Sequence, residues 1–293
     1  MKRALGAGVL GLVAAAAGTL LAQSQSTELH IKFQRGQAVV PIYEGWERLP
    51  DGTFNMVFGY LNRNHVEELV LPVGAQNNFE PGPADRGQPA YFYPRENHFV
   101  FKVNVPKDWD RKKELVWTLV ANGKTEAARA TLMDIWEIDR KVEVSNSGGG
   151  TATSNALIAK DQPPAVAFEP VSRVAAGTPV TLTATITDDG IPSPDAKRRP
   201  PREPEPSLKP IGPPSPVNVP LPQRPRPPQG LSVLWQVYRG PGKVTFDPEG
   251  YVKAVDGKAS VTATFTQRGT YVIRAFGHDS LLRTPADLTV TVQ

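Results

Sequence analysis

Hydrophobic and polar residues alternate along most of this 293-residue chain, in short runs separated by turn-forming residues. A period of two places every second side chain on one face, so these runs predict antiparallel β-strands with one face buried. No stretch has the sustained 3.6-residue period of a helix, and the pattern therefore indicates an all-β protein. In the first half, the positions predicted to face inward are Phe54, Met56, Phe58 and Tyr60; Leu69, Leu71 and Val73; Phe99, Phe101, Val103 and Val105; and Leu115, Trp117 and Leu119.

Turn signals join these runs into hairpins. Leu49-Pro-Asp-Gly52 separates the first two strands, and Asn122-Gly123 is the strongest two-residue hairpin signal in the chain. The segment 126–130 has a helix-forming composition, but the preceding turn and the alternation of its alanines favour a strand.

A second set of strands follows a composition change. Residues 143–164 are rich in glycine and small polar side chains, which predicts a flexible linker between two β-sandwich domains, at 27–142 and 165–293. The length of the chain fits two domains. The predicted inward positions of the second domain are Val180, Leu182, Ala184 and Ile186; Val233, Trp235 and Val237; Val261, Ala263 and Phe265; Tyr271, Ile273 and Ala275; and Leu288, Val290 and Val292.

The first 24 residues have the pattern of a secretory signal peptide. A basic start is followed by an apolar run over 4–22, and small residues at Ala22 and Ser24 suit cleavage. The alternative, an uncleaved anchor helix, is disfavoured by the Ala- and Gly-rich composition of the run. No later run approaches the ~20 apolar residues of a membrane span. We therefore expect a periplasmic or extracellular protein with no stable membrane span after cleavage.

Composition excludes several classes of protein and of binding site. The chain has no cysteine, which excludes a disulfide scaffold and a thiolate metal site. Its formal net charge is +4. Lys2, Arg3 and the segment 191–230 carry this excess, so the two predicted domains together are close to neutral. Nucleic-acid binding is therefore not predicted.

The strand order of the second half resembles immunoglobulin-like and polycystic-kidney-disease-type (PKD) modules of bacterial surface proteins. A Thr-rich strand, a strand with a central Trp, GPGKVTF, and Gly269-Thr-Tyr-Val-Ile273 occur in that order over about residues 163–293. The resemblance implies that Trp235 is the core tryptophan and Tyr271 the corner tyrosine, whose hydroxyl bonds back to the preceding turn. It implies a fold and no particular function.

Motifs of the first half resemble an uncharacterised bacterial secreted β-sandwich module, which carries no activity to transfer. The motifs are FGYxNxN, LPVGxxNxFxPG and DRGQP, followed by an aromatic strand. Their positions here are Gly59, Tyr60, Asn62, Asn64, Gly74, Asn78, Phe79, Gly82, Asp85, Arg86, Gly87 and Gln88.

Residues 191–230 form a proline-rich insert between two strands of the second domain, with 15 of the 30 prolines of the chain. Few bulky apolar residues are present and proline lacks an amide donor, so the composition predicts a disordered, extended segment. The simpler interpretation is a tolerated surface loop. The alternative is a basic tether that contacts an anionic envelope polymer or an aromatic groove of a partner protein.

Eight polar and aromatic residues of the first domain are candidate binding residues. Amide and aromatic side chains together suit a carbohydrate, because amides bond hydroxyl groups and flat rings cover the sugar face. The favoured alternative is that the asparagines satisfy turning backbone at the rim of the sandwich. The candidates are Asn62, Asn64, Asn77 and Asn78, with Tyr43, Trp46, Tyr91 and Tyr93 as the rings.

No catalytic, cofactor or metal motif stands out. The four histidines lack ligand spacing. Calcium at Asp188, Asp189 and Asp279 is the best metal alternative, although a turn explains Asp-Asp-Gly more simply. The acidic residues Glu67, Glu68, Glu80 and Asp85 are expected to be solvated rather than a glycosidase pair.

We therefore expect a non-catalytic exported protein of the bacterial envelope, without cofactors, that binds an envelope protein or a glycan or has a structural role. The alternative is a carbohydrate-binding protein or an enzyme that acts on envelope glycans.

Overall fold

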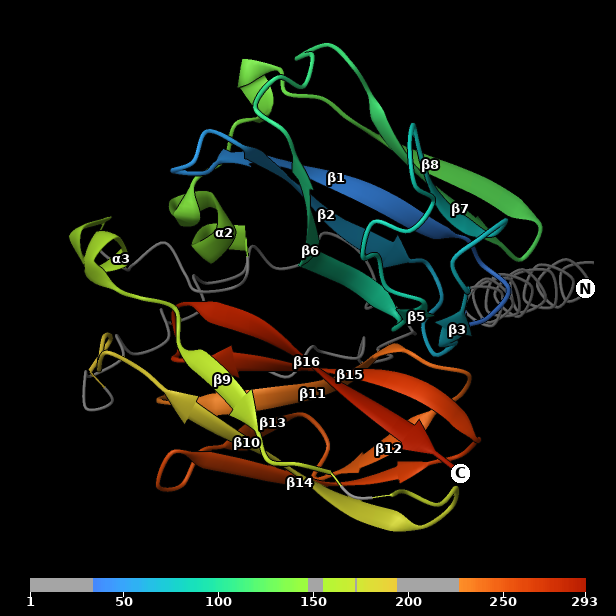
Figure 1. Cartoon of the computed structure of the whole chain (residues 1–293), viewed down its shortest axis with the longest axis vertical. Helices are drawn as coiled ribbons and strands as arrows, with labels where there is room; N and C mark the ends of the chain where they lie inside the picture. Colours follow the sequence, from blue (N-terminus) through green and yellow to red (C-terminus); the bar gives the residue numbers. More distant parts are fainter. Residues whose placement is uncertain (1–33, 147–154, 172, 194–226) are drawn as a thin grey trace, which may run out of the picture.

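The computed structural model describes residues 34–146, 155–171, 173–193 and 227–293. Two β-sandwiches lie against each other, the first in blue and green and the second in yellow to red (Figure 1). The predicted signal peptide and most of the proline-rich insert lie outside the described residues. Within these ranges, no helix has the length and apolar character needed to cross a membrane.

The first sandwich packs two three-stranded antiparallel sheets, in the orders β1-β2-β6 and β4-β7-β8, and a short β3-β5 pair. The first sheet contains β1 (Val39–Arg48), β2 (Phe54–Asn62) and β6 (Arg95–Val105). The second contains β4 (Asn77–Glu80), β7 (Leu115–Ala121) and β8 (Lys124–Ala130), and the pair contains β3 (Leu69–Val70) and β5 (Tyr91–Phe92).

Aromatic side chains fill the space between these sheets. The ring of Trp117 stacks on Phe79 at a centroid distance of 5.8 Å and meets Phe101 edge-on at 5.0 Å. Each such pair adds about 0.5–1.5 kcal/mol beyond the area that it buries. The inward positions predicted for 54–60, 99–105 and 115–119 are all buried, so alternation identified these core strands correctly.

Both predicted hairpins of the first sandwich are present. The amide of Gly52 donates to the carbonyl of Leu49 at 3.0 Å. Asn122 and Gly123 both have positive φ, 50° and 73°, as a tight turn between twisted strands requires. The segment after that turn is strand β8, so the strand interpretation of 126–130 is confirmed.

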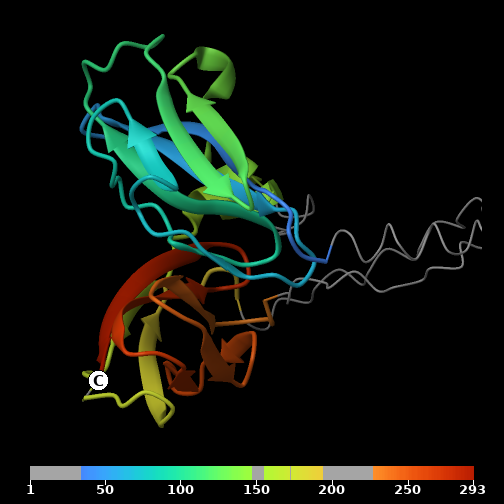
Figure 2. The same cartoon turned by 90° about the vertical axis from the view of Figure 1, so that its right-hand side faces the viewer.

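The second sandwich packs two four-stranded antiparallel sheets, in the orders β12-β14-β10-β9 and β13-β11-β15-β16. The first contains β9 (Ala165–Phe168), β10 (Pro179–Thr187), β12 (Val244–Asp247) and β14 (Lys258–Phe265). The second contains β11 (Ser232–Arg239), β13 (Tyr251–Lys253), β15 (Gly269–His278) and β16 (Arg283–Val292), and it faces the first sandwich (Figure 2).

Two residues that carried the immunoglobulin-like resemblance occupy the expected places. Trp235 is buried in the core and its ring lies 5.8 Å from that of Phe168. The hydroxyl of Tyr271 donates to the carbonyl of Gln267 at 3.0 Å, which is the back-bond of a corner tyrosine. Gly240 lies flat against this ring, where a Cβ atom would come within 2.2 Å of it.

Short helices occur where the sequence predicted only strands and a flexible linker. They are η1 (Asp134–Trp136), α2 (Arg140–Asn146) and α3 (Asn155–Lys160). The carboxylate of Asp139 accepts bonds from the amides of Lys141 and Val142 and so caps α2. Val144 and Ile158 pack with Leu281 of the second sandwich. Both ends of the predicted linker are therefore ordered by tertiary contacts; its centre, 147–154, lies outside the described residues.

Candidate functional site

Asn62 and Asn64 form a closed amide network inside the first sandwich. Both are fully buried. The Asn62 side chain donates to the carbonyls of Glu67 and Phe92 at 2.8 and 3.2 Å, and its oxygen accepts from the Asn64 side chain at 2.8 Å. Asn64 in turn bonds both backbone groups of Gln37. These two side chains satisfy backbone groups and offer no surface to a ligand.

Asn77 and Asn78 also bond to their own fold. The buried Asn77 amide donates to the carbonyls of Leu71 and Pro89 at 2.9 and 2.7 Å. Its oxygen accepts the indole N–H of Trp117 at 2.9 Å. The half-buried Asn78 donates to the carbonyl of Gly74 at 3.1 Å. The geometry of all four asparagines therefore fits the structural interpretation.

The four candidate rings do not share an exposed face. Trp46 is fully buried and its indole donates to the carbonyl of Met133 at 2.9 Å. Tyr91 is buried as well, and Tyr93 is half-buried. Tyr43 donates its hydroxyl to the carbonyl of Thr131 at 2.6 Å, and burial raises its pKa. Trp46 and Tyr91 are buried and Tyr43 and Tyr93 are half-buried, so the four rings present no common exposed face. That they bind a sugar stays a prediction.

Tyr91 and Tyr93 belong to a contact between the two sandwiches. The amide of Val237, on β11, donates to the hydroxyl of Tyr93 at 2.9 Å. One residue along, the Ala90 amide donates to the carbonyl of Tyr238 at 2.9 Å. The hydroxyl of Tyr238 returns a bond to the carbonyl of Gly87. Strand β11 is thus bonded to the segment 87–93 of the first sandwich.

Arg239 extends this contact to the DRGQP motif. Its guanidinium holds the Asp85 carboxylate through two bonds, at 2.9 and 2.8 Å, and donates to the carbonyl of Gln88 at 2.8 Å. Hydrogen bonding to Arg239 holds the pKa of Asp85 below its usual value. Gln88 is buried and accepts the amide of Arg86 at 2.7 Å. The motif therefore forms a loop of the first sandwich that binds Arg239 of the second sandwich.

Two further arginines join the sandwiches from β15 and β16. Arg274 is held by Asp287 through two bonds and donates to the carbonyl of Val100 at 2.8 Å. Its guanidinium lies 3.4 Å from the ring centroid of Tyr238. Arg283 donates to the carbonyl of His98 at 2.6 Å. We refer to the contacts of Arg239, Arg274 and Arg283 as the arginine lock; sequence reasoning missed it.

Three of the four acidic residues Glu67, Glu68, Glu80 and Asp85 accept hydrogen bonds from the fold itself. Glu67 accepts the amide of Gly36 at 2.7 Å. Glu68 accepts the hydroxyl of Tyr91, and Asp85 belongs to the arginine lock. Glu80 is exposed.

An exposed apolar strip lies on η1. Met133, Ile135 and Trp136 are 52%, 82% and 46% exposed. The ring of Trp136 lies 5.7 Å from that of Tyr43. Apolar side chains gathered in this way mark contact surfaces more often than single exposed ones do.

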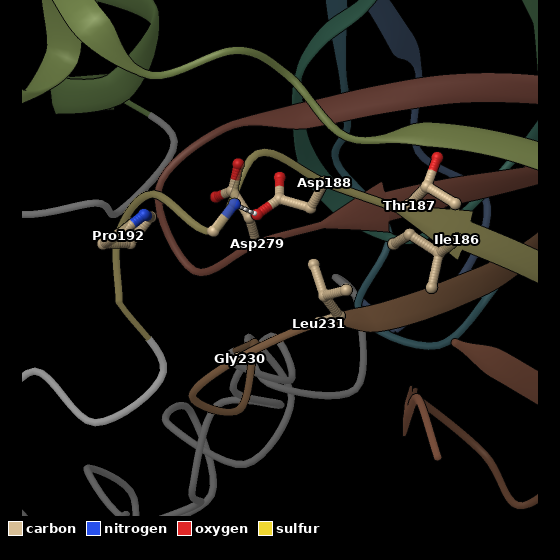
Figure 3. Close-up of a pocket in the computed structure, with 8 residues that line it drawn as sticks. Ile186, Thr187, Asp188, Pro192, Gly230, Leu231 and Asp279 are labelled. Carbon is tan, nitrogen blue, oxygen red and sulfur yellow. Dashed lines mark hydrogen bonds between the residues drawn. The ribbon is translucent and has the colours of Figure 1, made fainter. Parts of the chain in front are cut away.

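A cavity of about 320 Å³ lies at the end of the second sandwich where the proline-rich insert leaves and returns. Figure 3 shows Pro192 on one side of it and Gly230 on the other. Asp188, directly after β10, and Asp279, directly after β15, also line it. Asp188 accepts the amide of Gly190 at 2.8 Å, as expected for a turn.

The sequence matches no protein-family model and no curated relative. Among solved structures, it is similar to a conjugative transposon lipoprotein from Bacteroides eggerthii, at 12% identity and a TM-score of 0.26 over 44% of this chain and 96% of that one. It is also similar to the D00-D0 domain of intimin, at 13% identity and a TM-score of 0.26 over 87% and 100% of the two chains. Domains 4 and 5 of an S-layer protein match at 10% identity and 0.25, over 61% and 65%.

Proposed function

We propose that this chain is an exported, non-catalytic component of the bacterial cell envelope, with a structural or binding role. Its two sandwiches act as one rigid body that presents surfaces to an envelope partner. The observation that carries this proposal is the arginine lock. In it, the DRGQP motif of the first sandwich binds Arg239 of the second sandwich through Asp85 and Gln88.

The use of the motif residues supports a structural role. The buried side-chain amides donate hydrogen bonds to nearby backbone carbonyls, in Asn62, Asn64 and Asn77 alike. Buried polar groups need such partners. Export rests on the signal-peptide pattern of residues 1–24. Two candidate contact elements are the exposed apolar strip of η1 and, by its composition, the proline-rich insert.

A capture experiment tests which surface binds. Residues 25–293 are used as bait on the source organism's envelope fraction, beside a variant in which a short Gly-Ser bridge replaces 194–226. The ends of the insert line one cavity, so we expect this variant to fold with an unchanged melting temperature. A partner captured only by the full chain would make the insert the binding element.

An Ile135→Asp variant of the exposed apolar strip completes the comparison. Ile135 is 82% exposed, so the substitution leaves the core intact. Loss of the same partner in this variant alone would assign binding to η1. Failure of all three baits to retain any envelope protein, together with turnover of an envelope glycan, would contradict the proposal.

A glycan ligand is the second candidate, and the pairing of Tyr43 with the exposed Trp136 is the observation that favours it. Rings of this kind cover the apolar face of a sugar. Titration against a glycan panel tests this candidate. Trp136→Ala is the test variant and Ile135→Ala is the matched control. Saturable binding that only Trp136→Ala removes supports a glycan; no binding to the panel removes this candidate.

A further inference from the structure

Asp188 and Asp279 line the cavity of Figure 3 at the end of the second sandwich. Both of them, and Asp189, interact electrostatically with Asp161. Asp161 follows α3, Asp188 and Asp189 follow β10, and Asp279 follows β15. The α3 segment is fastened here, because Arg140 donates to the carbonyl of Asp161 at 2.7 Å and the Gln162 amide donates to Asp189 at 3.1 Å. Three separate segments of the chain therefore converge on one acidic cluster.

The hydrogen bonds within this cluster leave several buried oxygens unused. One oxygen of Asp279 accepts the amides of Leu281 and Leu282, at 2.6 and 2.7 Å. Its second oxygen, one oxygen of Asp188 and both oxygens of Asp161 are buried and have no hydrogen-bond partner among the described residues. Asp161 is fully buried and Asp279 is 2% exposed. A buried carboxylate without a partner is strongly destabilising, so these oxygens call for a ligand or a proton.

The electrostatics point the same way. Burial, followed by repulsion from the other three carboxylates, raises the pKa of Asp161 to about 7, although Arg140 of α2 acts in the opposite direction. Burial, with a smaller repulsion from Asp188, raises the pKa of Asp279 to about 6. His278 precedes Asp279, and its ring nitrogen accepts the Ser280 amide at 2.8 Å. Positive charge brought into the cluster would relieve both carboxylates.

We propose that this cluster binds one divalent cation, of the hard type that prefers oxygen ligands, with Ca²⁺ as the physiological ion. The ligands are the unused oxygens of Asp161, Asp188 and Asp279. Ca²⁺ suits them because it takes carboxylates, main-chain carbonyls and water in a flexible geometry. Among the described residues, no three acidic or histidine side chains already stand in position to hold a metal. Binding therefore draws the carboxylates together, and water and main-chain oxygens complete the shell.

Such an ion would tie α3 to the ends of β10 and β15, and so fix the interdomain segment to the second sandwich. Asp188 and Asp279 line the cavity, which gives the ion a route from solvent. Extracellular calcium modules typically bind with dissociation constants of about 10⁻⁴ to 10⁻³ M. We expect an affinity in that range, with Mg²⁺ weaker because it demands a stricter geometry and loses its water reluctantly.

The test uses the chain of residues 25–293, freed of metal with EDTA and titrated with CaCl₂ by calorimetry and thermal unfolding near neutral pH. We expect one saturable site per chain and a melting temperature that rises with Ca²⁺. No heat and no shift at millimolar Ca²⁺ would overturn the proposal.

A double variant, Asp161→Asn with Asp279→Asn, removes the charge with little change of shape. It should lose the Ca²⁺ response and, because repulsion is relieved, melt higher than the unsubstituted chain in EDTA. Asp256→Asn is the matched control: Asp256 is exposed in a turn at a φ of 50°, which Asn accepts, and this variant should keep the response. A double variant that responds to Ca²⁺ like the unsubstituted chain would overturn the assignment.

The pH dependence separates an ion from a proton. A carboxyl with a raised pKa destabilises the fold as pH rises from the unfolded pKa, about 4, to the folded one. Without Ca²⁺ the melting temperature of the unsubstituted chain should therefore fall relative to that of the double variant between about pH 4 and pH 7, and saturating Ca²⁺ should reduce that relative fall. A fall that Ca²⁺ leaves unchanged would show that protons alone neutralise the cluster, which contradicts the proposal.

Discussion

At the scale of single residues, the asparagines of the first sandwich act as internal connectors. A primary amide has two donor hydrogens and an acceptor oxygen, so one side chain can satisfy several backbone groups that strand pairing leaves free. Asn77 does so for Leu71 and Pro89 and also accepts the N–H of Trp117. These bonds hold an irregular loop against the aromatic core.

Asn77→Ala should be strongly destabilising. It leaves the indole N–H of Trp117 and two carbonyls buried without partners, at about 1–3 kcal/mol for each group that water cannot reach. We expect a loss of about 3 kcal/mol in the free energy of unfolding, measured by urea denaturation. Asn78→Ala, which removes one bond at a half-buried position, should cost under about 1.5 kcal/mol. Equal losses in the two variants would contradict this account.

The sequence predicted part of this picture. The spacing of Asn62, Asn64 and Asn77 around a short apolar run indicated that amides satisfy turning backbone, which agrees with their bonds. It did not indicate that Trp46 is fully buried. The alternation along β1 cannot show that Met133, 87 residues later, supplies the carbonyl that its indole needs.

At the scale of elements, alternation was sufficient for the long strands and insufficient for the short helices. Strands β2, β7 and β15 bury the positions that a period of two selects, and β10 buries Leu182, Ala184 and Ile186. Helix α3 has six residues, too few to be stable alone. The helix is stabilised by Ile158, which packs against Leu281 and Leu282. A local sequence pattern cannot predict a contact between residues so far apart in the chain.

Ile158→Ala should therefore loosen the interdomain segment more than the sandwiches. Burial of this side chain is the main apolar attachment of α3, and truncation of a buried isoleucine costs about 2–5 kcal/mol where it packs. Hydrogen exchange should become faster in α2 and α3, while the strands of both sandwiches keep their protection. Ile135→Ala, at a position that is 82% exposed, is the control and should change neither. Uniform loss of protection throughout the chain would contradict this attachment.

At the scale of the whole molecule, the contacts of the arginine lock join the two sandwiches to each other. Arg239 and its partner Asp85 are 154 residues apart in sequence, and Arg274 and its partner Val100 are 174 apart. Nothing in the sequence around Arg239 or Arg274 distinguishes either arginine from a solvated surface residue. The sequence therefore predicted the two folds, while their mutual contact became visible only in the structure.

A double-mutant cycle on Arg239→Ala and Asp85→Ala should show a coupling of about 0.5–1 kcal/mol, since the pair is bidentate but partly exposed. Bonding to Arg239 lowers the folded pKa of Asp85. The stability from the pair is therefore present above the unfolded pKa, about 3.9, and is lost as pH falls through the folded value. Urea unfolding at pH 7 and at about pH 2.5 measures this; a coupling that is as large in acid would contradict the ion pair.

The relative orientation of the two sandwiches tests the central claim most directly. Residual dipolar couplings of backbone amides, measured on residues 25–293 in a weakly aligned solution, report the alignment of each sandwich separately. The arginine lock predicts that one alignment tensor fits residues 34–130 and 227–293 together, in the orientation of Figure 1. Two tensors of different magnitude, as for two domains that swing independently, would contradict the rigid body on which the proposed function rests.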